Sequence, residues 1–149
     1  MREQFTDALK TAMKKQDKRK TSTLRLILAA IKDRDIASRS EDRDGVSDSE
    51  ILDILARMIK QRRESVVTYE EAGRLELAAQ EQEEIDIIST FLPKQLDDDE
   101  IDAAVTATLK EIDAAGLKDM GRAMAALKDR YAGQMDFSKA SAMVKSKLS

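Results

Sequence analysis

The chain has 149 residues and a net charge of −3; 37% of its residues are charged and only 3% are aromatic. It has no cysteine and no histidine, which excludes disulfides, thiolate chemistry, Cys/His zinc sites and imidazole acid–base catalysis. A single proline, few aromatics and 42% hydrophobic residues favour long amphipathic helices over a sheet, so the sequence predicts an all-α protein.

The composition also predicts where the protein is found. No apolar run approaches the roughly 20 residues that a membrane span requires. The N-terminal stretch MREQFTDALKTAMKK lacks the apolar centre of a signal peptide. We therefore expect a cytoplasmic protein that has no membrane partner.

The first two helices are predicted at residues 2–15 and 17–36, and they carry an excess of positive charge. Residues 1–37 hold ten basic and five acidic groups. The most basic spot is Lys18, Arg19 and Lys20 together with Arg25. Such a cluster is typical of a polyanion-binding surface or of a solvated helix face, and no aromatic residue is interleaved for base stacking. The apolar faces of the two helices are Phe5, Ala8, Leu9, Ala12 and Met13, then Leu24, Ile27, Leu28 and Ile31.

Residues 38–46 have no apolar anchor before the last position, which predicts a mobile loop. Ser47 and Glu50 then fit a capping box, the signature of a helix start. The apolar spacing that follows predicts a helix over residues 48–72.

A second long helix, at 74–92, folds back after Gly73 and is ended by Pro93. Arg62 and Glu81 each fall in the middle of an apolar stripe, where an unpaired charge is costly to bury. We therefore predict an ion pair between these two side chains across the hairpin. It serves either to fix the packing register or to hold the arginine rigid for a phosphate or carboxylate.

Three shorter helices are predicted in the last third of the chain. Asp97 and Glu100 form another start signature for a helix at 101–116. A helix at 120–131 follows, and Asp136 caps the last helix. Methionines recur at helical spacing in these segments, which indicates core positions.

Several linked motifs occur in order: LRLILAAIKDRDI, KQRRES, EEAGRLELAAQEQEE, FLPKQL, DDDEI and LKDMGRAM. Together they resemble the GatB/YqeY family, and specifically its short stand-alone YqeY-like proteins. The resemblance implies an N-terminal helical bundle with a long helical hairpin at 1–93 and a small three-helix C-terminal domain at 97–149. That domain is similar to the tail of the B subunit of the glutamine-dependent aspartyl/glutamyl-tRNA amidotransferase.

The family is labelled as having carbon–nitrogen ligase activity with glutamine as amido-N-donor, and in the amidotransferase the tail helps to hold tRNA while other domains catalyse. The present chain has no Walker-type phosphate loop and no Ser/His constellation. The acidic run 97–99 lies at a helix start, where acids favour the dipole, so we expect no metal there. The resemblance together with the missing catalytic motifs therefore predicts an accessory or tRNA-binding module without cofactor or catalytic centre. The alternative is a helical protein–protein interaction module with no RNA role.

Candidate RNA contacts lie in the C-terminal domain. Lys118 and Arg122 flank the start of the helix at 120–131, whose amides could also receive a phosphate. Residues 94–149 have a net charge of −1, so any affinity must come from a local patch and be salt-sensitive. The candidates are Lys118, Arg122, Lys128, Arg130, Lys139, Lys145 and Lys147.

Overall fold

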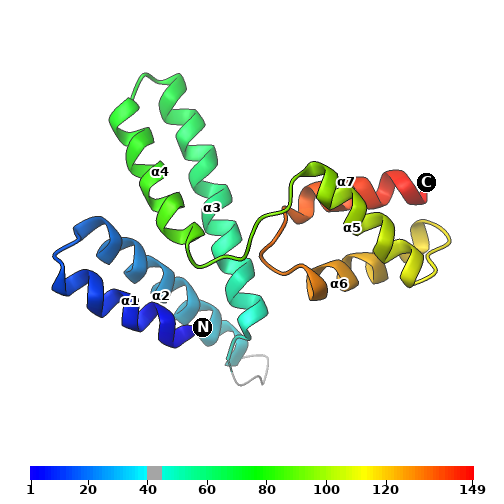
Figure 1. Ribbon diagram of the computed structural model, residues 1–149, viewed down its shortest axis with the longest axis horizontal. Helices are drawn as coiled ribbons and strands as arrows, with labels where there is room; N and C mark the ends of the chain where they lie inside the picture. The colour runs from blue at the N-terminus through cyan, green and yellow to red at the C-terminus, as the bar shows by residue number, and fades with distance from the viewer. Residues whose placement is uncertain (40–44) are drawn as a thin grey trace. The chain divides into compact units, whose positions relative to one another are not determined.

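The computed structural model describes residues 1–39 and 45–149, and over these residues the fold is all-α, as predicted (Figure 1). The chain divides into two compact units, Met1–Leu92 and Pro93–Ser149. Among the described residues, no helix combines the length and apolar character needed to cross a bilayer. The helices are α1 (Arg2–Lys14), α2 (Lys18–Arg39), α3 (Asp48–Glu71), α4 (Leu75–Ser89), α5 (Asp98–Glu111), the 3-10 helix η1 (Leu117–Asp119), α6 (Met120–Arg130) and α7 (Phe137–Leu148).

The predicted helix starts are confirmed by side-chain caps. The Ser47 hydroxyl accepts a hydrogen bond from the Glu50 amide at 3.2 Å, which begins α3. Asp97 and Glu100 form a full capping box at the start of α5, where each side chain accepts from the other residue's amide. Asp136 accepts from an amide of the first turn of α7. Each of these caps satisfies a backbone donor that the first helical turn leaves without a partner.

Helix α2 is longer than predicted. It continues to Arg39, because Ser38 is buried and its hydroxyl donates to the Asp35 carbonyl oxygen at 3.0 Å within the last turn. Residues 38 and 39 of the predicted mobile loop at 38–46 are therefore helical. Its residues 40–44 lie outside the described part of the chain.

Two other helices end earlier than predicted. Helix α4 ends at Ser89, three residues before the predicted end, because the amides of residues 90–92 donate to carbonyl oxygens three residues earlier, in tighter turns than an α-helix has. Helix α5 ends at Glu111 instead of continuing to Gly116. Asp113 adopts a left-handed conformation (φ 55°) that a helix cannot contain.

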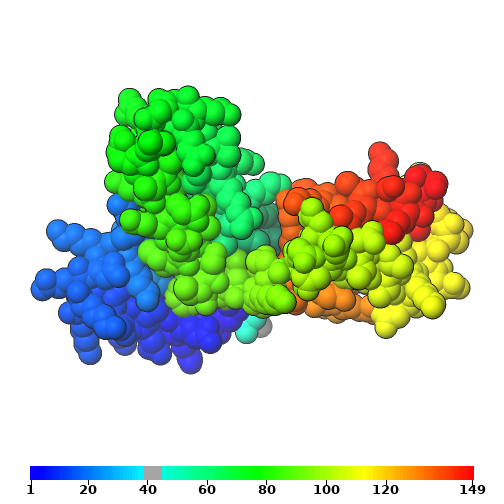
Figure 2. All heavy atoms as spheres, turned by 45° about the horizontal axis from the view of Figure 1, so that its top comes forward, coloured from blue at the N-terminus to red at the C-terminus, as the bar shows by residue number. Residues whose placement is uncertain are grey.

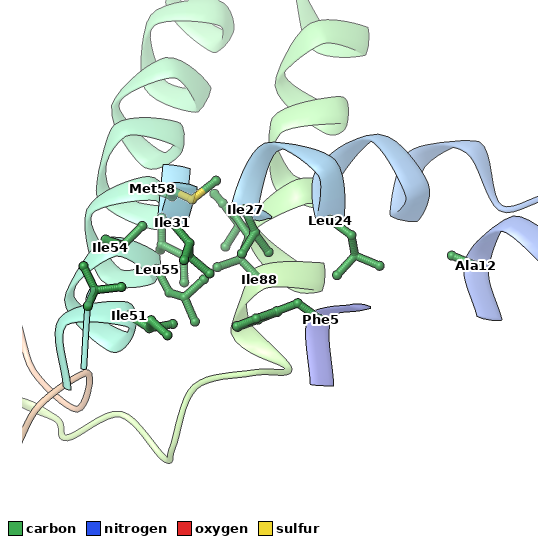
Figure 3. Packing of buried hydrophobic residues seen from close by; sticks show 13 residues of the cluster. Phe5, Ala12, Leu24, Ile27, Ile31, Ile51, Ile54, Leu55, Met58 and Ile88 are labelled. Carbon is green, nitrogen blue, oxygen red and sulfur yellow. The ribbon is translucent and has the colours of Figure 1, made fainter. Parts of the chain in front are cut away.

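The core of the first unit joins all four of its helices (Figure 3). Helix α1 packs on α2, α3 packs on α4, and α2 contacts both α3 and α4. The Phe5 ring lies 4.9 Å from the Phe91 ring, centroid to centroid. Met13, which was predicted to face inward, is instead 51% exposed, because it lies in the last turn of α1, next to the reversal into α2. The fully buried side chains at the centre of the core are Phe5, Leu24, Ile27, Ile51, Leu55 and Ile88.

The α3–α4 hairpin extends beyond this core. The last core residue of α3 is Ile59, and the first of α4 is Ile85. Between them, at 60–84, Ala78 is the only buried residue, and Leu75 at the start of α4 is 67% exposed. Figures 1 and 2 show the tip of the hairpin projecting away from α1 and α2. The outer half of the hairpin is therefore held mainly by contacts between its own two helices.

A polar contact ties the start of α1 to the end of α2 and to the entry of α3. The Arg2 guanidinium donates to the Asp35 carboxylate at 2.6 Å, and the Val46 amide donates to it at 3.0 Å. Asp35 raises the pKa of Arg2 through this hydrogen bond and through its charge. Gly45 has a φ of +100°, and a Cβ there would lie 3.1 Å from an Asp35 oxygen, so the turn requires glycine.

The second unit is a three-helix bundle with its own core. Helices α5, α6 and α7 all contact one another. The Leu96 amide donates to the Gln134 carbonyl oxygen at 2.7 Å, which fastens the segment before α5 to the turn before α7. Thr108 is buried, and its hydroxyl has no hydrogen-bond partner in the described structure. The buried core residues are Ile101, Ala104, Val105, Ala123, Leu127, Met135, Ala140 and Val144.

Candidate nucleic-acid interface

The seven predicted cations of the second unit fall into two groups. Three of them, Lys118, Lys128 and Lys145, are exposed and form no ion pair with any residue that the structure describes. An exposed cation without a counter-ion is the better phosphate ligand, because no carboxylate has to be displaced. The other four pair with carboxylates of the same unit: Arg122 with Asp119 (3.0 Å), Arg130 with Glu111, Lys139 with Asp98 (3.2 Å) and Lys147 with Asp102 (3.0 Å).

The start of α6 is less suited to phosphate than the sequence suggested. The Asp119 carboxylate accepts hydrogen bonds from the Ala115 amide at 2.7 Å and from Arg122 at 3.0 Å. The amide hydrogen bond, with a smaller contribution from Arg122, lowers the pKa of Asp119. A phosphate arriving between Lys118 and Arg122 would therefore meet a firmly ionised carboxylate.

A groove between α6 and α7 offers a different arrangement. It is open to solvent, has a volume of about 490 Å³, and is lined by Met124 and Lys128 of α6 and by Phe137, Ser138 and Ser141 of α7. The groove thus combines a cation, two hydroxyl groups and a half-buried aromatic ring. These are the groups that contact phosphates and stack on bases in single-stranded RNA.

Lys145 extends this surface along α7. Ser138, Ser141 and Lys145 are three and four residues apart, so they lie on one face of the helix. Helix α7 contains three lysines and no acidic residue. Lys145, which pairs with no described carboxylate, therefore lies on the same face of α7 as the groove serines, and no acidic residue of α7 lies between them.

Arg62 is paired, as predicted, but the predicted partner Glu81 is wrong, because Arg62 pairs with Glu84 instead. Its Nε donates to Glu84 at 2.8 Å, and its NH1 donates to the Met58 carbonyl oxygen at 3.2 Å. The predicted partner, Glu81, lies one turn earlier in α4. Arg62 and Glu84 are each eleven residues from Gly73. Because the chain reverses direction at Gly73, the two residues lie opposite each other on the neighbouring helices. With its guanidinium used in this way, Arg62 has a structural role.

The acidic run at the start of α5 is also engaged in structure. Asp97 caps the helix, and Asp98 binds Lys139. Within the described ranges, no group of three or more His, Cys, Asp or Glu side chains is placed to hold a metal ion.

The family profile of the YqeY-like proteins matches residues 2–148. The chain belongs to the YqeY-like protein family. This YqeY-like chain is similar to proteins named "Altered inheritance of mitochondria protein 41, mitochondrial". The relative in Eremothecium gossypii is 35% identical over 95 residues, which are 59% of this chain and 50% of the relative. The relative in Lachancea thermotolerans is 32% identical over 108 residues, 71% and 56% of the two chains. In Saccharomyces cerevisiae the identity is 34% over 84 residues, 56% and 44% of the two chains.

These relatives correct one prediction. The YqeY-like chain spans about half the length of the three relatives, and the names of these relatives describe them as mitochondrial. The cytoplasmic location expected from composition is contradicted by this comparison. The prediction was wrong because it rested on the lack of a long apolar run, and such a lack does not distinguish between the cytoplasm and other compartments.

Proposed function

We propose that this YqeY-like chain is an accessory tRNA-binding module, related to tRNA-dependent amidation and without a catalytic centre of its own. The α6–α7 groove with Lys128, and Lys145 farther along α7, carry the proposal, because neither lysine pairs with a carboxylate that the structure describes. The resemblance of the C-terminal domain to the tail of an amidotransferase subunit supports tRNA as the ligand.

In the proposed complex the contacts are directed to the RNA backbone. The ammonium groups of Lys128 and Lys145 neutralise phosphates, and the hydroxyl groups of Ser138 and Ser141 donate to phosphate oxygens. The Phe137 ring offers a surface to an unstacked base or a ribose. Such contacts read shape and charge more than base sequence, so the module would position a tRNA without selecting it by sequence.

The strength of binding follows from the number of cations. Two phosphate contacts give a slope of log affinity against log salt of about −1.5, and at 0.1 M salt they contribute roughly 30-fold to the affinity relative to 1 M. The unit as a whole carries a net charge near zero, which adds little long-range attraction. We therefore expect weak binding that salt abolishes.

The test is a titration of the full chain with total tRNA across a salt series. In the double variant K128Q/K145Q the affinity should fall by roughly 30-fold at 0.1 M salt, and the salt slope should shrink by about 1.5. The matched control is K94Q/K110Q, which removes two exposed cations of the same unit that lie outside the groove.

The outcomes separate the alternatives. Equal losses in the two double variants would show that net charge, and not the groove, determines binding. If the unsubstituted chain does not bind tRNA at low salt, the RNA role is refuted and the protein-interaction alternative takes its place.

A further inference from the structure

The turn between α1 and α2 carries the densest positive charge in the chain. Residues 14–25 contain six basic residues and one acidic residue, a net charge of +5 in twelve positions. Five of the six form what we term the α1–α2 corner. They are Lys14, Lys15, Lys18, Lys20 and Arg25.

The side chains of the corner are accessible and form no ion pair with a described residue. Four of its side chains are exposed and Lys20 is half-buried, and none of the five pairs with a carboxylate that the structure describes. The sixth basic residue, Arg19, differs, because it lies 3.3 Å from Glu83 and 3.7 Å from Glu84. Arg19 thus holds the start of α2 against α4, while the five corner cations remain available.

Four of the five cations, all but Lys20, are brought together by how the two helices meet. Lys18, Ser22 and Arg25 lie at i, i+4 and i+7 on one face of α2, over about 10 Å of helix. Lys14 ends α1 and Lys15 caps it. The chain then reverses within a short turn into α2, with Gln16 in a left-handed conformation (φ 55°). In Figure 2 the atoms of this turn lie at the surface of the first unit.

Like charges packed this closely repel one another, and the repulsion is relieved when a polyanion binds. We propose that the α1–α2 corner is a second phosphate-binding surface that takes the RNA backbone, which rests on the proposed RNA-binding function. Lysines on flexible stems suit contacts to several phosphates in variable geometry. No aromatic residue lies in the corner, so its contacts are to backbone and not to bases.

Two other polyanions fit less well. An anionic membrane surface requires an exposed apolar face beside the cations, but Leu24 and Ile27 of α2 are fully buried in the core. An acidic protein surface would need an apolar anchor for stable docking. The large hydrophobic side chains exposed near the corner are Met13 and Leu26, two single residues on different helices.

Two phosphate sites on one chain have a consequence for affinity. Where one RNA contacts both the groove and the corner, the second contact is intramolecular and so takes place at a raised effective concentration. An RNA long enough to reach both sites then binds more tightly than either site would allow. The corner therefore adds length dependence as well as salt dependence.

The test compares two quadruple variants that remove the same net charge from exposed positions of the first unit. Binding to tRNA is measured in the full chain, and circular dichroism checks that both variants fold. If two of the four substituted cations contact phosphates, the corner variant loses about 30-fold in affinity at 0.1 M salt and its slope shrinks by about 1.5, relative to the control. The corner variant is K14Q/K15Q/K18Q/R25Q, and the control is K10Q/K32Q/R63Q/R74Q.

The results distinguish this proposal from the function on which it rests. If the corner and control variants bind tRNA equally while K128Q/K145Q weakens binding, the corner is refuted and the groove stands. If the corner variant is weakened and K128Q/K145Q is not, the corner alone binds RNA. Tighter binding to polyglutamate or to phosphatidylserine vesicles than to tRNA would overturn the assignment of RNA as the ligand.

Discussion

Replacing Glu84 by leucine should destabilise the first unit by more than an exposed ion pair is worth. The Arg62 and Glu84 side chains are only 13% and 16% exposed. Removing one member of a buried pair costs about 3–5 kcal/mol, because the other charge stays buried without a partner. Arg62 retains the Met58 carbonyl oxygen and some contact with water, so we expect a loss of ~3 kcal/mol in the free energy of unfolding.

The double variant R62M/E84L should recover most of this loss. Methionine and leucine are apolar side chains of suitable length for these two partly buried positions, and no uncompensated buried charge remains. Replacing a buried pair by apolar side chains is often neutral, so we expect the double variant to lie within about 1 kcal/mol of the parent. The control is E81L, which removes a half-buried glutamate one turn away and should cost less than ~1 kcal/mol.

The assay must report on the first unit alone, because the two compact units need not unfold together. The chain has two tyrosines and no tryptophan, so a Y131F background leaves Tyr69 of α3 as the only tyrosine fluorophore. With a urea dependence of about 1.5 kcal/mol/M, the E84L midpoint should fall by roughly 2 M. A loss below 1 kcal/mol, or a double variant as unstable as E84L, would refute the reasoning from burial.

Two further predictions concern the second unit. The T108V substitution should raise its stability by about 1 kcal/mol, because it removes a buried hydroxyl without a partner, and a fall in the urea midpoint of Tyr131 fluorescence would contradict this. Asp119 has a lowered pKa, mainly because the Ala115 amide donates to its carboxylate, so its contribution to stability is present above the pKa of an unfolded aspartate and is lost as the pH falls through the lower folded value. The D119N variant should therefore be less stable than the parent at neutral pH and equally stable in strong acid, and a difference that persists at acid pH would argue against this assignment.

Helix starts were predictable from the sequence because their signals are local. The Ser47 and Asp97 side chains accept hydrogen bonds from amides three residues later, within one helical turn. Helix ends depend on tertiary packing. The end of α2 is extended past the predicted stop because Ser38 becomes buried. No pattern within one turn of Ser38 reveals that burial.

Which carboxylate pairs with which cation was likewise not predictable from local sequence. The position of Arg62 in an apolar stripe predicted that it would be paired, but angular position around the helix favoured Glu81 over Glu84. Position along the helix axis decided the outcome. Glu84, and not Glu81, lies directly across the hairpin from Arg62, and the long arginine side chain can reach a carboxylate at the edge of the stripe. The pairing of Lys139 with Asp98 joins residues 41 positions apart, so the sequence could not reveal that this candidate cation was engaged. The groove of the second unit became visible only when α6 and α7 were packed together.

Because the hairpin extends beyond the core, we expect the outer end of α3 to open more easily than the part of α3 that packs in the core. Up to Ile59, opening α3 would expose the core shared with α1 and α2. The twelve residues of α3 beyond it, about 18 Å of helix, are held mostly by α4. Their amides can therefore exchange with solvent through an opening of the tip that leaves the base folded. The Arg62–Glu84 pair lies near the start of this outer segment. It links α3 to α4 there, so an opening that begins at the tip must break this ion pair before it reaches the core.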